Sequence, residues 1–276
     1  MKKTLAALGK AACYTALFLG AQFFIVMAAT MIEGFALGFE IALSGGMPDM
    51  QALQARLTEA ILSGATVYTL IANAVTLGLL WVFFAARKKN VLAEVSFREV
   101  PALAYVPLSI GGAALAVTIT TVLGMLPIPD AVWEEYANAS AHLEQTGFFA
   151  VLSTVLVAPV AEEVVFRGLV YTRLRRAMPV WAAALLQSLI FASLHGQALW
   201  IGYAFVMGLA LTVVFERTGS VLASIATHVA FNLVGGYFLS ELPVTPLFAA
   251  LCAAAAAGCW IWLARICPYT KLRPEK

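Results

Sequence analysis

The apolar positions of this chain come in long runs, and polar residues gather in the breaks between them. A helix needs about 20 predominantly apolar residues to cross the hydrocarbon core of a bilayer. Runs that meet or approach this length predict spanning helices at residues 12–36, 66–86, 101–126, 147–172, 179–195, 198–215, 220–240 and 245–266. The fifth and sixth of these eight runs are short and meet in a tight turn, so the pattern leaves open whether both cross fully.

The composition changes this picture little but excludes several classes of protein. Hydrophobic residues make up 62% of the 276 residues and charged residues 12%, whereas soluble domains carry about 25% charged residues. The composition also excludes a disordered chain, a nucleic-acid-binding protein and a disulfide-rich domain. We therefore predict an all-α, polytopic transmembrane bundle of about eight spans, surrounded by the lipid bilayer and without a nucleic-acid partner.

The distribution of lysine and arginine predicts the orientation in the membrane. With eight spans, all 17 basic residues except Arg56 and Arg167 fall in segments on one side. The segment 127–146, on the other side, is acidic instead. Because basic loops are retained in the cytoplasm, both termini are predicted to be cytoplasmic. The short loops are of bacterial style, so we expect an integral protein of a bacterial inner or cell membrane.

Two segments outside the predicted spans have a weaker pattern. Apolar residues recur at every fourth position from Leu53 to Ile61, which predicts an amphipathic helix at 50–62 on the outer leaflet surface. The acidic segment 127–146 is typical of a short outer helix or cap. The residues themselves indicate no function for 45–65 or for 127–146.

Six polar side chains lie inside the predicted spans of the C-terminal half. A charged group near the bilayer centre costs at least ~2.5–3.5 kcal/mol, so such residues need a reason to be there. They are Glu162, Glu163, Arg167, His195, His228 and Asn232. Glu163 and Arg167 are four residues apart and can pair on one helix face, as can His228 and Asn232. Glu162 is turned by about 100° from Glu163, and we expect it to point elsewhere, toward another helix.

The depth of these groups permits a common site. At 1.5 Å per residue, Glu162 and His228 lie roughly 16 Å from the cytoplasmic ends of their helices, and His195 lies roughly 24 Å from the end of its helix. Asn232 is one turn deeper than His228. Three different helices therefore bring polar groups to comparable depth, where one cavity can hold them.

The chemistry of this set favours hydrolysis. A carboxylate with two imidazoles and an amide can activate water and stabilise an oxyanion. The sequence has no GxSxG motif, and its cysteines lie elsewhere, so water is the natural nucleophile. Glu162, His195 and His228 also form a possible zinc ligand set, although there is no HExxH motif. The residues leave open whether a metal or the side chains alone hold the water.

These residues resemble three motifs of a known family. Glu162-Glu163-xxx-Arg167 resembles EExxxR, Phe191-xxx-His195 resembles FxxxH, and His228-xxx-Asn232 resembles HxxxN. In this order and on successive apolar helices, they are similar to the motifs of the CPBP family. That family contains the type II CAAX prenyl endopeptidases and the bacterial Abi proteins of bacteriocin processing or self-immunity. The resemblance covers about residues 147–240.

The resemblance implies an eight-helix intramembrane endopeptidase that acts on a peptide or a membrane protein. By motif position, Glu162 and His195 would activate the water, and His228 and Asn232 would line the oxyanion site. Glu163 and Arg167 would support the site as a pair. Family members are described both as zinc proteases and as metal-independent, glutamate-dependent ones. We expect no cofactor here, with zinc as the alternative.

The same resemblance divides the chain into three parts. Residues 1–146 hold the first three spans with the amphipathic and acidic outer segments. Residues 147–240 form the catalytic core, and residues 241–276 form the last span and a basic cytoplasmic tail.

Two other functions fit the same residues. A non-catalytic scaffold or immunity protein with this fold would keep Glu163 and Arg167 as a buried salt bridge. A proton-coupled transporter also places glutamate and histidine within the membrane. Such a transporter is expected to show repeat symmetry, and the sequence has no convincing internal repeat.

Overall fold

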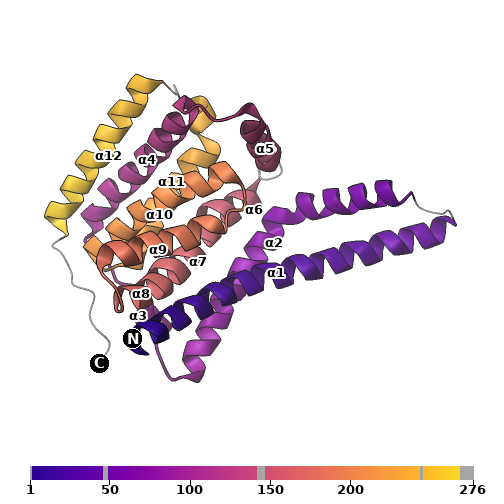
Figure 1. Ribbon diagram of the computed structural model, residues 1–276, viewed down its shortest axis with the longest axis horizontal. Coiled ribbons are helices and arrows are strands. Elements are labelled where there is room, and N and C mark those ends of the chain that lie inside the picture. Colours follow the sequence, from indigo (N-terminus) through magenta and orange to yellow (C-terminus); the bar gives the residue numbers. More distant parts are fainter. Residues whose placement is uncertain (1, 46–48, 142–146, 243–244, 268–276) are drawn as a thin grey trace.

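The computed structural model describes residues 2–45, 49–141, 147–242 and 245–267, and its elements in these ranges are all helical. This confirms the predicted all-α class. Figure 1 shows two parts, a bundle formed by the helices from α4 onward and a long hairpin of α1 and α2 that projects from it. The predicted basic tail lies mostly in residues 268–276, outside the described residues, as does the end of the acidic outer segment at 142–146.

The N-terminal half contains the hairpin, a short linker and two further helices. Its elements are α1 (Lys2–Ser44), α2 (Met50–Ala86), α3 (Val91–Glu94), η1 (Ala102–Ala104), α4 (Tyr105–Met125) and α5 (Asp130–Ala141). α5 confirms a short helix within the acidic segment 127–146.

The C-terminal half begins with one helical run that changes its winding several times. This run consists of α6 (Phe148–Val151), η2 (Leu152–Val157), α7 (Ala158–Glu162), η3 (Glu163–Tyr171) and α8 (Thr172–Arg175). The remaining elements are α9 (Val180–Ser193), α10 (Ala198–Thr218), α11 (Val221–Tyr237), η4 (Leu239–Glu241) and α12 (Pro246–Ile266).

Every predicted span lies on a helix of the structure. Among the described residues, six helical segments are long and apolar enough to cross a membrane. α9 and α11 are shorter, with 14 and 17 residues. A helix of 14 residues is about 21 Å long, less than the ~30 Å hydrocarbon core. Of the two short runs expected, the fifth is therefore a short helix, α9, whereas the sixth, α10, is long enough to cross the membrane. The orientation of the termini stays a prediction.

The hairpin is longer than its apolar pattern indicated. α1 has 43 residues and α2 has 37, so they extend about 65 and 55 Å. The separate amphipathic helix predicted at 50–62 is wrong, because these residues form the first turns of α2 without a break. Asp49 caps that end by accepting a hydrogen bond from the backbone N–H of Gln51.

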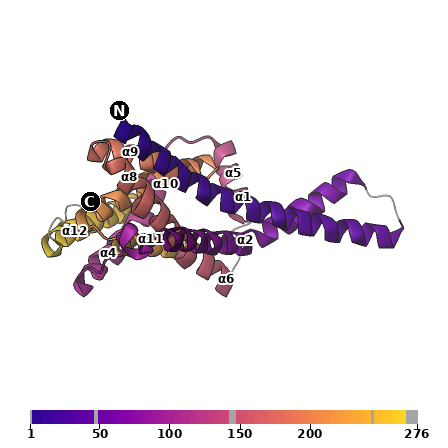
Figure 2. The ribbon, with the colours of Figure 1, turned by 90° about the horizontal axis from the view of Figure 1, so that it is seen from below.

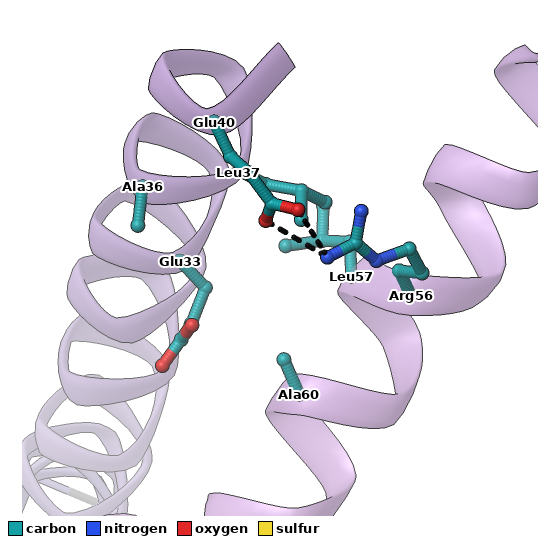
Figure 3. A pocket seen from close by; sticks show the side chains of 7 residues that line it. All are labelled: Glu33, Ala36, Leu37, Glu40, Arg56, Leu57 and Ala60. Atoms are coloured by element: carbon teal, nitrogen blue, oxygen red, sulfur yellow. Dashed lines mark hydrogen bonds and ion pairs between the residues drawn. The ribbon is translucent and has the colours of Figure 1, made fainter. Parts of the chain in front are cut away.

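A polar contact joins the two arms of the hairpin away from the bundle. Arg56 of α2 forms an ion pair with Glu40 of α1 at 2.8 Å, and both side chains are exposed. Beside it lies a cavity of about 270 Å³ that is also lined by Glu33 (Figure 3). The views of Figures 1 and 2 agree that this part of the hairpin stands clear of the other helices.

The helix that carries the two glutamates is wound more widely than an α-helix. η2 and η3 are π-helical, with α7 between them. In a π-helix each backbone N–H bonds to the carbonyl five residues earlier, and such turns often occur at functional sites. Pro159 lies at the second position of α7, where it provides no N–H donor. The winding therefore changes on both sides of the proline and directly before Glu163.

Close packing of α4 against α11 fixes the position of the helix that carries His228. Gly112 of α4 lies against the backbone of Thr227, and a Cβ atom at this glycine would clash with the Thr227 carbonyl oxygen. Backbone cannot move aside as the end of a flexible side chain can. The two helices therefore approach this closely only because residue 112 has no side chain.

Gly112→Ala is expected to destabilise the bundle, because the added methyl group forces α11 away from α4. Overpacking of this kind costs about 1–3 kcal/mol, so the melting temperature in detergent should fall by about 5 °C. The matched control is Gly124→Ala on the same helix, where a Cβ atom meets nothing within 4 Å. Equal melting temperatures of both variants would contradict the close contact.

Candidate active site

A fully buried ion pair forms the centre of the polar cluster. Arg167 Nη1 lies 2.6 Å from Glu163 Oε1, and both side chains are 0% exposed. Arg167 Nη2 donates a hydrogen bond of 3.1 Å to the carbonyl oxygen of Gly208 on α10. The guanidinium also lies over the ring of Phe191 on α9, 4.6 Å from its centroid. The predicted pairing of Glu163 with Arg167 is therefore present and joins three elements.

His228 on α11 joins this ion pair. Its Nδ1 lies 2.8 Å from Glu163 Oε1, and its Nε2 lies 3.7 Å from Glu162 Oε2. A carboxylate next to an arginine is an acceptor, so the Nδ1 of His228 carries the proton in this contact. The tautomer of the neutral ring is then fixed, and Nε2 faces Glu162.

Both glutamates therefore approach the same imidazole. Glu162 reaches a partner on another helix, as expected, but this partner is the histidine that Glu163 also contacts, so the two carboxylates do not point to separate groups. The two Cα atoms are turned from each other on the helix, but each side chain has three rotatable bonds. The ring of His228 bridges the difference, because it presents one nitrogen to each carboxylate. Glu162 remains distinct in one respect: its side chain is 19% exposed, whereas that of Glu163 is fully buried.

The exposed part of Glu162 faces a cavity that it shares with His195. The cavity has a volume of about 280 Å³. It is lined by Phe18, Leu19, Gln22, Thr69, Asn73, Glu162, Phe166, Phe191, Leu194 and His195. His195 lies just beyond the end of α9, and its Nδ1 is 3.0 Å from the carbonyl oxygen of Phe191. That oxygen can only accept a hydrogen bond, so Nε2 of the neutral ring is left as an acceptor.

Asn232 and His228 lie outside the lining of this cavity. Asn232 Nδ2 donates to the carbonyl oxygen of Thr154 on η2 at 2.9 Å. The Thr154 hydroxyl in turn lies 2.9 Å from the hydroxyl of Tyr237. His228 is 1% exposed. The structure thus brings Glu162 and His195 together at the cavity and His228 behind Glu162. The oxyanion role of His228 and Asn232 stays a prediction.

The possible zinc ligands are not gathered around one point. Among the described residues, no three His, Cys, Asp or Glu side chains are placed to hold a metal ion. The contacts of Nδ1 with Phe191 and Glu163 leave Nε2 of both His195 and His228 free to bind a metal, so it is the placement of the side chains that does not form a ligand set. The expectation of no cofactor stays a prediction.

The sequence reasoning missed one wall of the cavity. Gln22 of α1 and Asn73 of α2 lie on it, with Thr69 one turn before Asn73. Gln22 Nε2 donates a hydrogen bond of 3.1 Å to Asn73 Oδ1. The signal was present, since both amides lie inside predicted spans. Polar groups are costly in the membrane in the N-terminal half as well as in the C-terminal half. The same criterion therefore identifies Gln22 and Asn73 as candidate functional residues.

Comparisons with known proteins cover the C-terminal cluster. Residues 144–234 match the sequence profile of the type II CAAX prenyl endopeptidase Rce1-like family. An uncharacterized 24.3 kDa protein of Escherichia coli is 32% identical over 92 residues, which cover 32% of this chain and 42% of that protein. No solved structure matches the chain. The three sequence motifs all fall within the profile match, which confirms the predicted resemblance to this family over residues 144–234.

The buried ion pair generates a prediction about stability. Glu163→Gln leaves the guanidinium of Arg167 buried without its counter-charge, which costs about 3–5 kcal/mol. Arg167→Met should be similarly harmful, because it leaves Glu163 unpaired. The double variant should recover part of the loss, and a double-mutant cycle of melting temperatures in detergent measures this coupling. Glu40→Gln, which removes the exposed partner of Arg56, is the control and should have little effect. Additive losses would contradict the coupling.

Proposed function

Residues 144–234 belong to the CAAX/CPBP-type intramembrane protease family, and from this premise we propose that the chain hydrolyses peptide bonds with water activated by Glu162 in the membrane-embedded cavity. The observation that carries the proposal is the shared lining of one cavity by Glu162 and His195. Glu162 is the member of the glutamate pair that is accessible to a water molecule, while Glu163 is sealed in the ion pair.

The reaction follows from the groups at the cavity. Glu162 accepts a proton from water while Nε2 of His195 accepts a hydrogen bond from the same molecule. The hydroxide oxygen forms a bond to the carbonyl carbon, and the carbonyl π-electrons move to oxygen. When the C–N bond breaks, the nitrogen takes the proton that Glu162 holds. The products are a carboxylic acid and an amine, and Glu162 returns to its ionised state.

The charges behind Glu162 support this cycle. Glu163 neutralises Arg167 and orients His228, so the Nε2 side of that ring faces Glu162. Nε2 of His228 lies 3.7 Å from Glu162 Oε2, so the neutral ring can accept a hydrogen bond from Glu162 while Glu162 holds the proton taken from water. Because Glu163 and Arg167 are fully buried, we assign them to holding His228 in place rather than to contact with substrate.

The location and size of the cavity favour a substrate that is a short extended segment. Typical small-molecule pockets have about 300–1,000 Å³, and this cavity of about 280 Å³ is at the lower limit. It lies between apolar helices that are long enough to span a membrane. We therefore propose that the substrate is a membrane-associated peptide or an unwound segment of a membrane protein.

Glu162→Gln is expected to abolish proteolysis, with a loss of at least about 100-fold, because the amide cannot take the proton from water. The control is Glu135→Gln on α5, which removes an exposed carboxylate of the outer helix. New N-termini are mapped by mass spectrometry in membranes of cells that express each variant at equal level. Cleavage products that persist in Glu162→Gln would contradict the mechanism. A cellular effect that survives without any cleavage would support the scaffold instead.

The metal question has a separate test, in which the protein is purified without added metal. We expect zinc well below one ion per chain and activity that a chelator leaves unchanged, because the described residues do not gather three ligands. Metal content is measured by mass spectrometry on the same sample as the activity. Stoichiometric zinc together with chelator-sensitive cleavage would overturn the metal-free mechanism.

A further inference from the structure

The wall of the cavity that is contributed by the hairpin lies outside the family match. Glu162 and His195 come from the matched segment, whereas Gln22 and Asn73 come from α1 and α2. This wall is therefore a property of this chain that the three motifs do not describe. Its polar side chains need a reason of their own.

Asn73 is buried, with 1% exposure, in the middle of an apolar helix that is long enough to span a membrane. Its Oδ1 accepts the hydrogen bond from Gln22 Nε2. Within the described residues neither amide has a further hydrogen-bond partner. The N–H groups of Asn73 Nδ2 and the oxygen Oε1 of Gln22 are therefore free to bond to a molecule in the cavity that these residues line. These groups line the cavity from which Glu162 takes water, so they can bond to water or to the polar groups of a bound molecule.

The position of this amide pair is fixed by the packing of α2. Thr66, Thr69, Asn73 and Thr76 follow at intervals of three and four residues and share one face of the helix. The hydroxyl of Ser153 on η2 donates a hydrogen bond of 3.0 Å to the carbonyl oxygen of Thr66. This bond holds the polar face of α2 against the run of helices that carries Glu162.

We propose that Gln22 and Asn73 bind the main chain of the substrate peptide and hold it extended across Glu162 and His195. A peptide unit offers one C=O acceptor and one N–H donor, and the pair offers one free donor group and one free acceptor. A substrate segment in a membrane cavity loses its hydrogen bonds to water, so this match compensates for that loss. The interaction selects an unwound backbone and tolerates many side chains. The inference rests on the proposed proteolytic function.

A structural role must be separated from this one, since the same hydrogen bond joins α1 to α2. A purely structural pair predicts that its removal lowers stability and leaves substrate recognition alone. A backbone-binding pair predicts a change that depends on a particular peptide bond of the substrate. Replacement of single amides by esters in the substrate removes one N–H at a time and reads out this dependence.

The probe is an internally quenched peptide of about 12 residues. It spans a cleavage site mapped by comparing membranes that contain the wild type with membranes that contain Glu162→Gln. The full-length protein is reconstituted in vesicles of phosphatidylethanolamine and phosphatidylglycerol. Asn73→Leu should raise KM for this peptide about tenfold, as expected for one lost hydrogen bond, with kcat changed less than threefold. In the wild type, one ester near the scissile bond should raise KM similarly. In Gln22→Leu, which removes the acceptor Oε1 that this substrate N–H would reach, the same ester should have little further effect.

Two variants keep the test decisive. Thr76→Val is the control, because Thr76 is buried on the same face of α2 but bonds only to the carbonyl oxygen of Ala72; its KM should stay at the wild-type value. Gln22→Leu removes the acceptor of the half-buried partner on α1; its KM should rise similarly, and it keeps the test decisive if Asn73→Leu does not fold.

The failures of the two proposals are distinguishable. An unchanged KM in the amide variants, or losses from Gln22→Leu and the ester that simply add, would overturn the binding role while Glu162-dependent cleavage stands. Absence of any Glu162-dependent cleavage would overturn the proteolytic function and, with it, the inference.

Discussion

The geometry of the candidate site depends on one ion pair that water does not reach. Glu163 and Arg167 are both fully buried, and the desolvation of two charges offsets much of their attraction. The pair is therefore better understood as a constraint on geometry than as a source of stability. Glu163 Oε1 accepts hydrogen bonds from both Arg167 and His228, and Arg167 reaches Gly208. Through these contacts η3, α10 and α11 are fixed relative to one another.

Close helix packing makes this arrangement possible. A Cβ atom at Gly208 would lie 3.1 Å from Cβ of Ser188 and 3.4 Å from the ring of Phe191, so α9 and α10 approach each other closely at the carbonyl that Arg167 needs. Gly112 plays the same part between α4 and α11, where it lies against Thr227, the residue directly before His228. The charged groups thus lie in a frame of small residues, as expected where lipid offers no hydrophobic driving force between helices.

The sequence predicted well what depends on local spacing. Helical periodicity alone paired Glu163 with Arg167, and each of the predicted apolar runs falls on a helix of the structure. It was less informative where side chains converge from different elements. Glu162 and Glu163 both contact the imidazole of His228 because α11 packs beside their helix. The spacing of residues within 148–175 does not predict where α11 packs. The extent of α2 was also missed, because hydropathy marks where lipid contact begins and a helix can continue past that point.

The contact between the hairpin and the matched segment is visible in the structure but not predictable from the sequence motifs. Among the described residues, the side chain of His195 has one hydrogen bond, between its Nδ1 and the carbonyl oxygen of Phe191, and ring packing contributes to the rest of its orientation. A row of aromatic contacts runs from Phe18 to Phe166, on to Phe191 and then to His195, with centroid distances of 5.4, 5.2 and 4.9 Å. α1 therefore helps to position a ring that the motifs identify as reactive. The hairpin provides one wall of the cavity, so the shape of the cavity depends on α1 and α2 as well, although Glu162 and His195 come from the matched third of the chain.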